Sequence, residues 1–163
     1  MKLNTLKDLY VEQLKDVYSA EQQITEALPK MIEATSHNEL RQAFQEHLQQ
    51  TKQQISRLEQ VFQSLGTNPT GHKCKGMEGL IKEAEEMLKE NADSDVLDAA
   101  LITNAQRVEH YEIAAYGTIC TYAEMLGLND HKNLLGQTLD EEKMTDERLT
   151  RLAEQVVNAD AMA

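Results

Sequence analysis

The chain has 163 residues, which is enough for one domain to bury a continuous core without disulfide or metal staples. Gly, Pro and aromatic residues are scarce and charged residues make up 27%, a composition that favours helices over a β-sandwich or barrel. A formal net charge of −12, without a cluster of Lys and Arg, argues against a nucleic-acid partner and suits the attraction of cations.

The two cysteines, Cys74 and Cys120, lie in different segments and lack the spacing of a metal site. A disulfide framework is therefore not expected, and a reducing compartment is predicted. The charged, amphipathic stretch MKLNTLKDLYVEQL does not have the pattern of a signal peptide, and no apolar run reaches the roughly 18–20 residues of a membrane span. These patterns predict a soluble, cytoplasmic protein without a membrane partner.

Apolar residues at steps of three and four predict two long helices in the first part of the chain. The first spans about 5–34 and contains Pro29, which is expected to kink it or to relax its last turn. The second spans about 37–64, where Ser36 and Glu39 form a capping-box pattern at its start. Because the connection between them is short, an antiparallel hairpin is expected.

A second hairpin is predicted after a long connection. Gly66 ends the second helix and opens the loop 66–76, which leads into a short amphipathic helix. Two more long helices follow, over about 95–126 and about 130–158. The whole pattern predicts a single domain over 1–163, an all-α, ferritin-like four-helix bundle whose crossover carries a short fifth helix. A cytokine-type bundle is the less favoured alternative, because it needs two long connections.

Each long helix interrupts its apolar face with polar residues near its middle. At about 100° per residue, Glu112 lies on the apolar face of the third long helix, Glu109 lies at its margin, and His110 points to the opposite side. The polar residues on or beside the four apolar faces are Glu21, His47, Thr51, Glu109, Glu112, Glu142 and Asp146.

Residues equidistant from a hairpin turn lie at the same height, which places Glu21 near 51–53 and Glu112 near 144–146. Both hairpins therefore bring their polar residues into one layer. Crowded carboxylates repel one another unless they share protons or a cation neutralises them. Since a His among carboxylates is a ligand set for divalent metals, iron and manganese included, a buried metal site is predicted. A protonated, hydrogen-bonded polar layer is the alternative.

Five runs, which together span nearly the whole chain, carry a resemblance to a known family. In order they are DVYSAEQQITEALPKM (16–31), AFQEHLQQTKQQISRLEQ (43–60), KCKGMEGLIKEA (73–84), VEHYEIAAYGT (108–118) and LDEEKMTDERLTRLA (139–153). With these runs the chain resembles the ferritin-like superfamily, and within it the YciE/YciF-type branch of bacterial stress proteins. The resemblance implies a four-helix bundle that forms a homodimer, with a di-iron centre and a ferroxidase-like role in which O2 or peroxide is consumed.

The superfamily places one Glu on each of two helices and a Glu-x-x-His on each of the other two. Glu21 matches the single Glu of the first helix, and Glu112 or Glu109 that of the third. No Glu-x-x-His occurs in this sequence, where the second helix offers His47 and the fourth offers two acidic residues one turn apart. This leaves open a di-iron centre and a weaker, carboxylate-rich site that holds one ion or accepts manganese. The metal-site candidates are Glu21, His47, Glu109, Glu112, Glu142 and Asp146.

Two functional hypotheses follow. In the first, the bundle core binds iron and reacts it with O2 or peroxide, as a ferroxidase-type oxidoreductase that limits oxidative damage. In the second, the chain is a non-catalytic stress or interaction bundle that has lost the metal chemistry. Tyr18 and Tyr116 are interpreted as amphipathic core residues, and the pair His72 and Cys74 is a weak metal pattern that adds nothing to either hypothesis.

Overall fold

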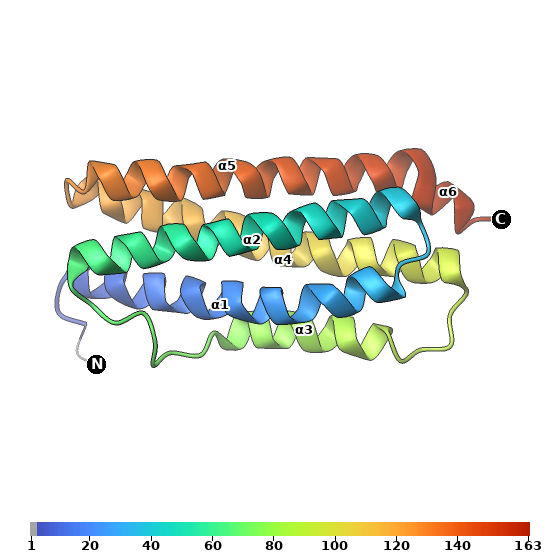
Figure 1. The fold of residues 1–163 in the computed structure, drawn as a ribbon, viewed down its shortest axis with the longest axis horizontal. Coiled ribbons are helices and arrows are strands. Elements are labelled where there is room, and N and C mark those ends of the chain that lie inside the picture. Colours follow the sequence, from blue (N-terminus) through green and yellow to red (C-terminus); the bar gives the residue numbers. More distant parts are fainter. Residues whose placement is uncertain (1–2) are drawn as a thin grey trace.

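The computed structural model describes residues 3–163, which are helical almost throughout (Figure 1). The first two residues of the domain predicted over 1–163 lie outside this range. Two antiparallel pairs of long helices form the bundle, and a shorter helix lies in the connection between them. In chain order the elements are α1 (Leu6–Ala34), α2 (Asn38–Leu65), α3 (Lys75–Met87), α4 (Ser94–Met125), α5 (Asn129–Leu152), the π-helical turn η1 (Ala153–Val157) and α6 (Asn158–Asp160).

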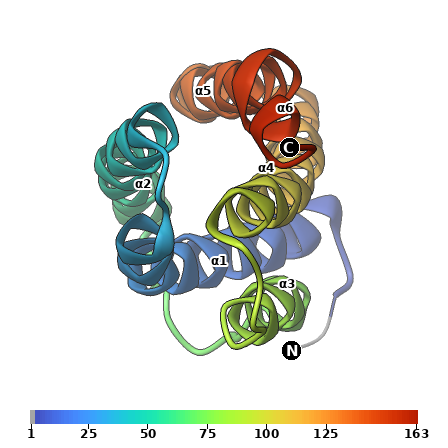
Figure 2. The same ribbon diagram turned by 90° about the vertical axis from the view of Figure 1, so that its right-hand side faces the viewer.

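Seen along the bundle axis, α1, α2, α5 and α4 follow one another around a common interior (Figure 2). The crossover returns the chain to the end where α1 finishes, so α2 and α4 run in the same direction (Figure 1). Helix α3 lies outside this ring, packed against α1 and α4. The ferritin-like bundle with one crossover, predicted from the spacing of apolar residues, is therefore confirmed. Within residues 3–163, none of the helices has both the length and the apolar character that crossing a membrane requires.

The start of α1 and the end of α2 follow from local chemistry. Thr5 and Asp8 form a reciprocal capping box, in which each side chain accepts a hydrogen bond from the backbone of the other, at 3.1 and 2.9 Å. Gly66 ends α2 with φ of 62°, the left-handed conformation that glycine adopts without a steric penalty. Pro29 lies inside α1, which continues past it to Ala34.

The capping box predicted for Ser36 and Glu39 does not form. His37 is the residue before α2, and no side chain near it in sequence caps the helix. Instead, the buried carboxylate of Asp98 on α4 accepts hydrogen bonds from the backbone of Ser36 (3.1 Å), the hydroxyl of Ser36 (2.5 Å) and the backbone of His37 (2.8 Å). The turn between α1 and α2 is thus held by the opposite hairpin, through a contact that local sequence patterns do not contain.

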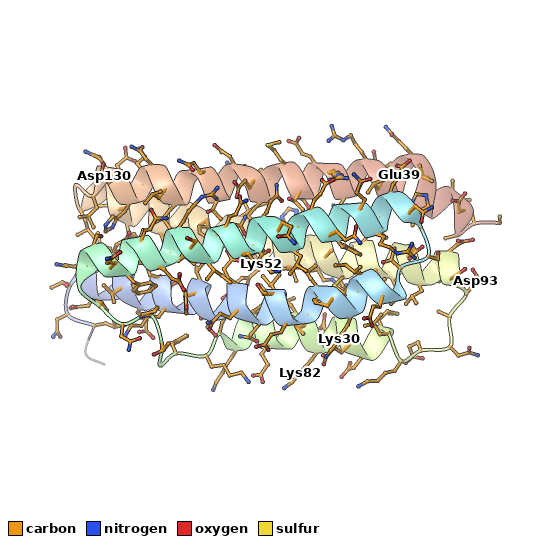
Figure 3. All side chains as sticks on the ribbon, viewed as in Figure 1. Lys30, Glu39, Lys52, Lys82, Asp93 and Asp130 are labelled. Carbon is orange, nitrogen blue, oxygen red and sulfur yellow. The ribbon has the colours of Figure 1, made fainter. Side chains whose placement is uncertain are left out.

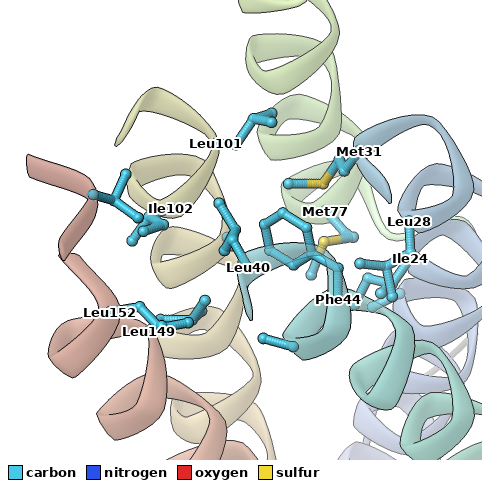
Figure 4. Packing of buried hydrophobic residues seen from close by; sticks show 14 of the residues in the cluster. Ile24, Leu28, Met31, Leu40, Phe44, Met77, Leu101, Ile102, Leu149 and Leu152 are labelled. Atoms are coloured by element: carbon cyan, nitrogen blue, oxygen red, sulfur yellow. The ribbon is translucent and has the colours of Figure 1, made fainter. Parts of the chain in front are cut away.

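Two apolar clusters fill the interior, one toward each end of the bundle. The cluster near the α1–α2 turn combines side chains from all the long helices and α3, including Leu28, Phe44 and Leu149 (Figure 4). The other cluster includes Leu14 and Leu135. Between them lies a layer of buried acidic residues and one His, so the apolar clusters keep water away from that layer from both sides.

The Asp98 contact yields a prediction about stability. Replacing Asp98 with Ala leaves the Ser36 and His37 amides without their acceptor, so the free energy of unfolding should fall by about 2–3 kcal/mol. Urea denaturation followed by circular dichroism measures this change. The control is Asp140→Ala, which removes the same group from an exposed position of α5. Equal stability of the two variants would show that Asp98 does not hold the turn.

Candidate metal centre

Each of the four long helices contributes acidic or imidazole side chains to the buried layer. These side chains have at most 3% of their surface exposed, which is rare for carboxylates in proteins. The residues are Glu21 on α1, His47 on α2, Glu109 and Glu112 on α4, and Glu142 on α5.

The closest group in this layer consists of His47, Glu109, Glu112 and Glu142. Each of them offers one ligand atom, and these atoms all lie within 4.8 Å of one another. The imidazole of His47 lies between two carboxylates, with Nδ1 3.2 Å from Oε1 of Glu109 and Nε2 3.8 Å from Oε2 of Glu142. A buried imidazole surrounded by carboxylates is a ligand set that divalent transition metals accept, so this group could bind a metal ion.

The polar atoms of this group are also unusual in lacking hydrogen bonds. Both carboxylate oxygens of Glu109 and Glu112, both ring nitrogens of His47 and one oxygen each of Glu142 and Glu21 have no partner within residues 3–163. More than nine in ten buried polar groups in native proteins have one. A shared proton or a bound cation is needed to compensate for so many unpaired acceptors at one place.

Burial also sets the protonation of the site in the absence of a cation. Burial, and then the nearby charge of Glu142, raise the pKa of Glu109 and Glu112 well above the usual range. The same two causes raise the pKa of Glu21 to about 8, although a hydrogen bond from Tyr116 acts against them. Burial lowers the pKa of His47. The metal-free layer therefore combines protonated carboxyl groups at Glu109 and Glu112 with a neutral imidazole at His47, the form of His that binds metals.

Several neighbouring side chains orient these groups. Gln54 on α2 donates hydrogen bonds to Glu142 and, over 3.0 Å, to Glu141. The guanidinium of Arg57 holds both oxygens of Glu141, each at 2.7 Å. Burial alone would raise the pKa of Glu141, but the hydrogen bonds from Arg57 and Gln54 outweigh it and lower this pKa. On the opposite side of the layer, the hydroxyl of Tyr116 donates to Glu21 over 2.5 Å.

The structure does not bring Asp146 into the group. One oxygen of Asp146 accepts a hydrogen bond from Gln106 at 3.1 Å, and the other lies 3.1 Å from Nε2 of His110. Four residues after Glu142, Asp146 is roughly 6 Å further along α5 and rotated by about 40°. That displacement carries its carboxylate to the flank between α4 and α5. Asp146 therefore differs from Glu142 both in its height along α5 and in the direction of its side chain.

The helical periodicity predicted the side-chain direction of His110 correctly but underestimated the burial of Glu109. Glu109, expected at the margin of the apolar face, is as buried as Glu112. The reason is that α4 packs against α1, α5 and α3, so more of its circumference is covered than its apolar stripe indicates. His110 points away from the interior as expected, with 68% of its side chain exposed, and its Nε2 lies 3.1 Å from a carboxylate oxygen of Asp146 on α5.

The crossover contacts α1 through a separate set of side chains. His72 lies 2.9 Å from Glu12 and 2.9 Å from Asp16, through different ring nitrogens. The thiol of Cys74 is 3.0 Å from the hydroxyl of Tyr111 and 3.3 Å from Asp16. Since every one of these groups has a partner, the set is explained by attachment of the crossover to the bundle.

Gln54 was not singled out from the sequence, although a signal was present. It follows His47 by seven residues, which is two helical turns, and therefore lies on the same face of α2. Glu21 is buried, as expected, but it is not among the four residues of the closest group. The role of these side chains as ligands stays a prediction.

Fold and site together define a ferritin-like helical bundle with a buried His and Glu group that could hold a metal ion. The chain belongs to the family described as a domain of unknown function, DUF892, whose model matches residues 5–162. It is 49% identical to Protein YciF of Escherichia coli K12 over 162 residues, which cover 99% of this chain and 98% of that protein.

Solved structures agree with the family assignment. The crystal structure of the E. coli stress protein YciF superimposes with a TM-score of 0.92 at 49% identity, over 96% of this chain and 99% of that one. YcfI from Rhodopseudomonas palustris, provisionally described as a structural protein, gives 0.89 at 50% identity over 91% and 95%. A protein from Xanthomonas campestris gives 0.78 at 18% identity over 97% of both chains, a likeness of fold alone.

The raised pKa of Glu21 yields a prediction about pH. Between its ordinary value of 4.5 and about 8, this carboxyl group binds a proton in the native metal-free protein but not in the unfolded chain, so stability falls as pH rises through that window. Glu21→Gln keeps the acceptor for Tyr116 without titrating. It should therefore stabilise the metal-free protein at pH 8 by roughly 1–3 kcal/mol, and hardly at all at pH 4.

Chemical denaturation in the presence of a chelator, repeated across that pH range, measures the difference. Glu26→Gln is the matched control, because it removes an exposed carboxylate from the same helix. A constant difference between Glu21→Gln and the unaltered protein at all pH values would contradict the assignment.

Proposed function

We propose that the bundle binds divalent iron in the buried layer and oxidises it, which limits the damage that free Fe(II) causes in the presence of oxidants. The observation that carries the proposal is the convergence of unpaired ligand atoms from three helices at His47, Glu109, Glu112 and Glu142. No hydrogen bond within residues 3–163 accounts for these atoms, whereas a divalent cation would.

The donor set suits the proposed metal. Carboxylates and one imidazole are ligands for Fe(II) and Mn(II), whereas neither Cys74 nor Cys120, the ligands of softer metals, belongs to the group. The three carboxylates of the closest group, with Glu21 beside them, offer enough oxygens for one ion or for a bridged pair. Bound iron supplies the one-electron redox chemistry, in which each Fe(II) loses one electron and O2 or peroxide takes up electrons and protons to give peroxide or water.

The protein's own residues would perform the remaining tasks. Cation binding displaces the protons that Glu109 and Glu112 carry, because a positive charge reverses the effect of burial on their pKa. Gln54 and Arg57 fix the adjacent carboxylates of α5, so their positions are set before the cation enters. Glu21, which accepts a hydrogen bond from Tyr116 and whose pKa burial raises to about 8, would hold a proton beside this group.

A second candidate function is a non-catalytic stress or interaction bundle. Its support is that Thr145 stands three residues after Glu142, where the superfamily has His, and that no Glu-x-x-His occurs elsewhere in the chain. In that case the carboxyl groups would stay protonated and the protein would bind no stoichiometric metal.

By analogy with the relative named a stress protein, either function would serve a stress response. The reducing, cytoplasmic location, the homodimer and the single-domain organisation belong to the same proposal.

An anaerobic Fe(II) titration of the metal-free protein, followed by O2 or peroxide and optical detection of Fe(III), separates the two functions. We expect saturable binding that Glu112→Gln/Glu142→Gln weakens by at least about 100-fold, because each change removes a buried anionic ligand. The control is Glu26→Gln/Glu154→Gln, which removes two exposed carboxylates. Lack of saturation, or equal oxidation by the double ligand variant, would refute the ferroxidase proposal.

Gln54→Leu tests the supporting contacts separately. Without the hydrogen bond from Gln54, Glu142 keeps its carboxyl group but loses its fixed orientation, so metal affinity should fall by about 10–100-fold. Competition with a coloured chelator measures the affinity. Gln53→Leu, an exposed substitution on the same helix, should leave it unchanged. Equal affinities for the two variants would show that Gln54 does not position Glu142.

A further inference from the structure

A small apolar cavity extends from the metal-site layer toward the outer surface of the bundle. It lies where α3 covers α1 and α4, has a volume of about 30 Å³, and includes His47 and Glu109 in its lining. The rest of the wall is mostly aliphatic, with Ile24, Ile81, Ala84 and Val108 among its members. Lys30, Glu85 and Asn104 also line the cavity, but nearly all of the surface that faces it is apolar. The cavity therefore joins the candidate ligands to a space that offers few hydrogen-bonding partners.

The outer side of this cavity is closed by an ion pair. Nζ of Lys30 on α1 lies 2.6 Å from Oε1 of Glu85 on α3, and 61% of the Lys30 side chain is exposed. Figure 3 labels Lys30 on the side of the bundle where α3 lies. A shallow surface depression shares Ala27, Lys30, Ile81 and Glu85 with the cavity, so the two adjoin at this pair. Exposed ion pairs contribute only about 0–1 kcal/mol, which means that side-chain motion opens this boundary easily.

The chemistry of the wall selects what can enter. A cavity of this size has room for a water molecule, but an aliphatic wall offers too few partners, and apolar cavities in proteins stay dry while accepting xenon. O2 is small and apolar and loses no hydrogen bonds on entering. Hydrogen peroxide donates and accepts hydrogen bonds at both ends, so its transfer into such a space is unfavourable.

We propose that this cavity is a binding site and entry route for O2, which makes O2 and not peroxide the oxidant that reaches His47 and Glu109 by this path. The use of O2 at the centre depends on the proposed function, whereas the binding of a small apolar molecule does not. Small side chains keep the space open: Ala84 on α3 and Ala105 on α4 line it, and a longer side chain at either position would fill it.

The first test uses metal-free protein and xenon as the probe. Crystals under xenon pressure, or xenon-129 NMR in solution, should show one bound atom beneath α3 in the unaltered protein and none in Ala84→Leu. Ala105→Val is the second variant, in case Leu at position 84 prevents folding, and it should weaken the signal. Ala114→Leu, on the exposed face of α4, is the control. Lack of xenon binding to the unaltered protein overturns the proposal, whether or not the protein binds metal.

The second test compares oxidants on Fe(II)-loaded protein. Ala84→Leu should slow oxidation by O2 about tenfold or more, while oxidation by hydrogen peroxide and the affinity for Fe(II) stay unchanged. Equal slowing with both oxidants, or no slowing with O2, overturns the route. If Fe(II) does not bind at all, both the proposed function and the use of the cavity as an O2 route are refuted. The xenon experiment alone then decides whether the apolar binding site exists.

Discussion

Carboxyl groups buried in the middle of a helical bundle are the constraint on which the rest of this structure depends. An isolated ionised carboxylate in an apolar interior is so unfavourable that it takes up a proton or acquires a counter-charge. Here the acidic side chains come from α1, α4 and α5, with an imidazole from α2 among them, and apolar clusters lie on either side. The fold therefore tolerates the layer only while protons or a cation compensate its charge.

Contacts around the layer reduce its negative charge and orient its carboxylates. Glu141, next to Glu142 in sequence, is partly exposed and is neutralised by Arg57, which removes one negative charge from the neighbourhood. Gln54 connects that surface pair to the buried carboxylate. The side of the layer that faces α3 is different, because there the aliphatic cavity meets His47 and Glu109. One flank of the centre is thus polar and hydrogen-bonded, and the other is apolar.

Much of this arrangement could be predicted from the sequence, for identifiable reasons. Steps of three and four between apolar residues locate the long helices, and equal distances from the hairpin turns place Glu21, Glu112 and Glu142 in one layer. Periodicity gives the direction of a side chain only to within a broad arc, however. Glu109 is buried because α3 also covers α4, whereas Asp146 on α5 is turned toward the flank between α4 and α5 and stays outside the group. The Asp98 contact joins residues about sixty positions apart, and no local pattern encodes it.

The division of the ligand atoms between the two hairpins has a further consequence. His47 belongs to the first hairpin, and Glu109, Glu112 and Glu142 belong to the second, so a cation held by all four would cross-link two halves that are otherwise joined by side-chain packing and a single covalent connection. Docking of the hairpins and occupancy of the centre are then thermodynamically linked, because any motion that separates the halves also dismantles the coordination. Because of this linkage, the rigidity of the bundle would rise and fall with the fraction of protein whose centre holds a metal ion.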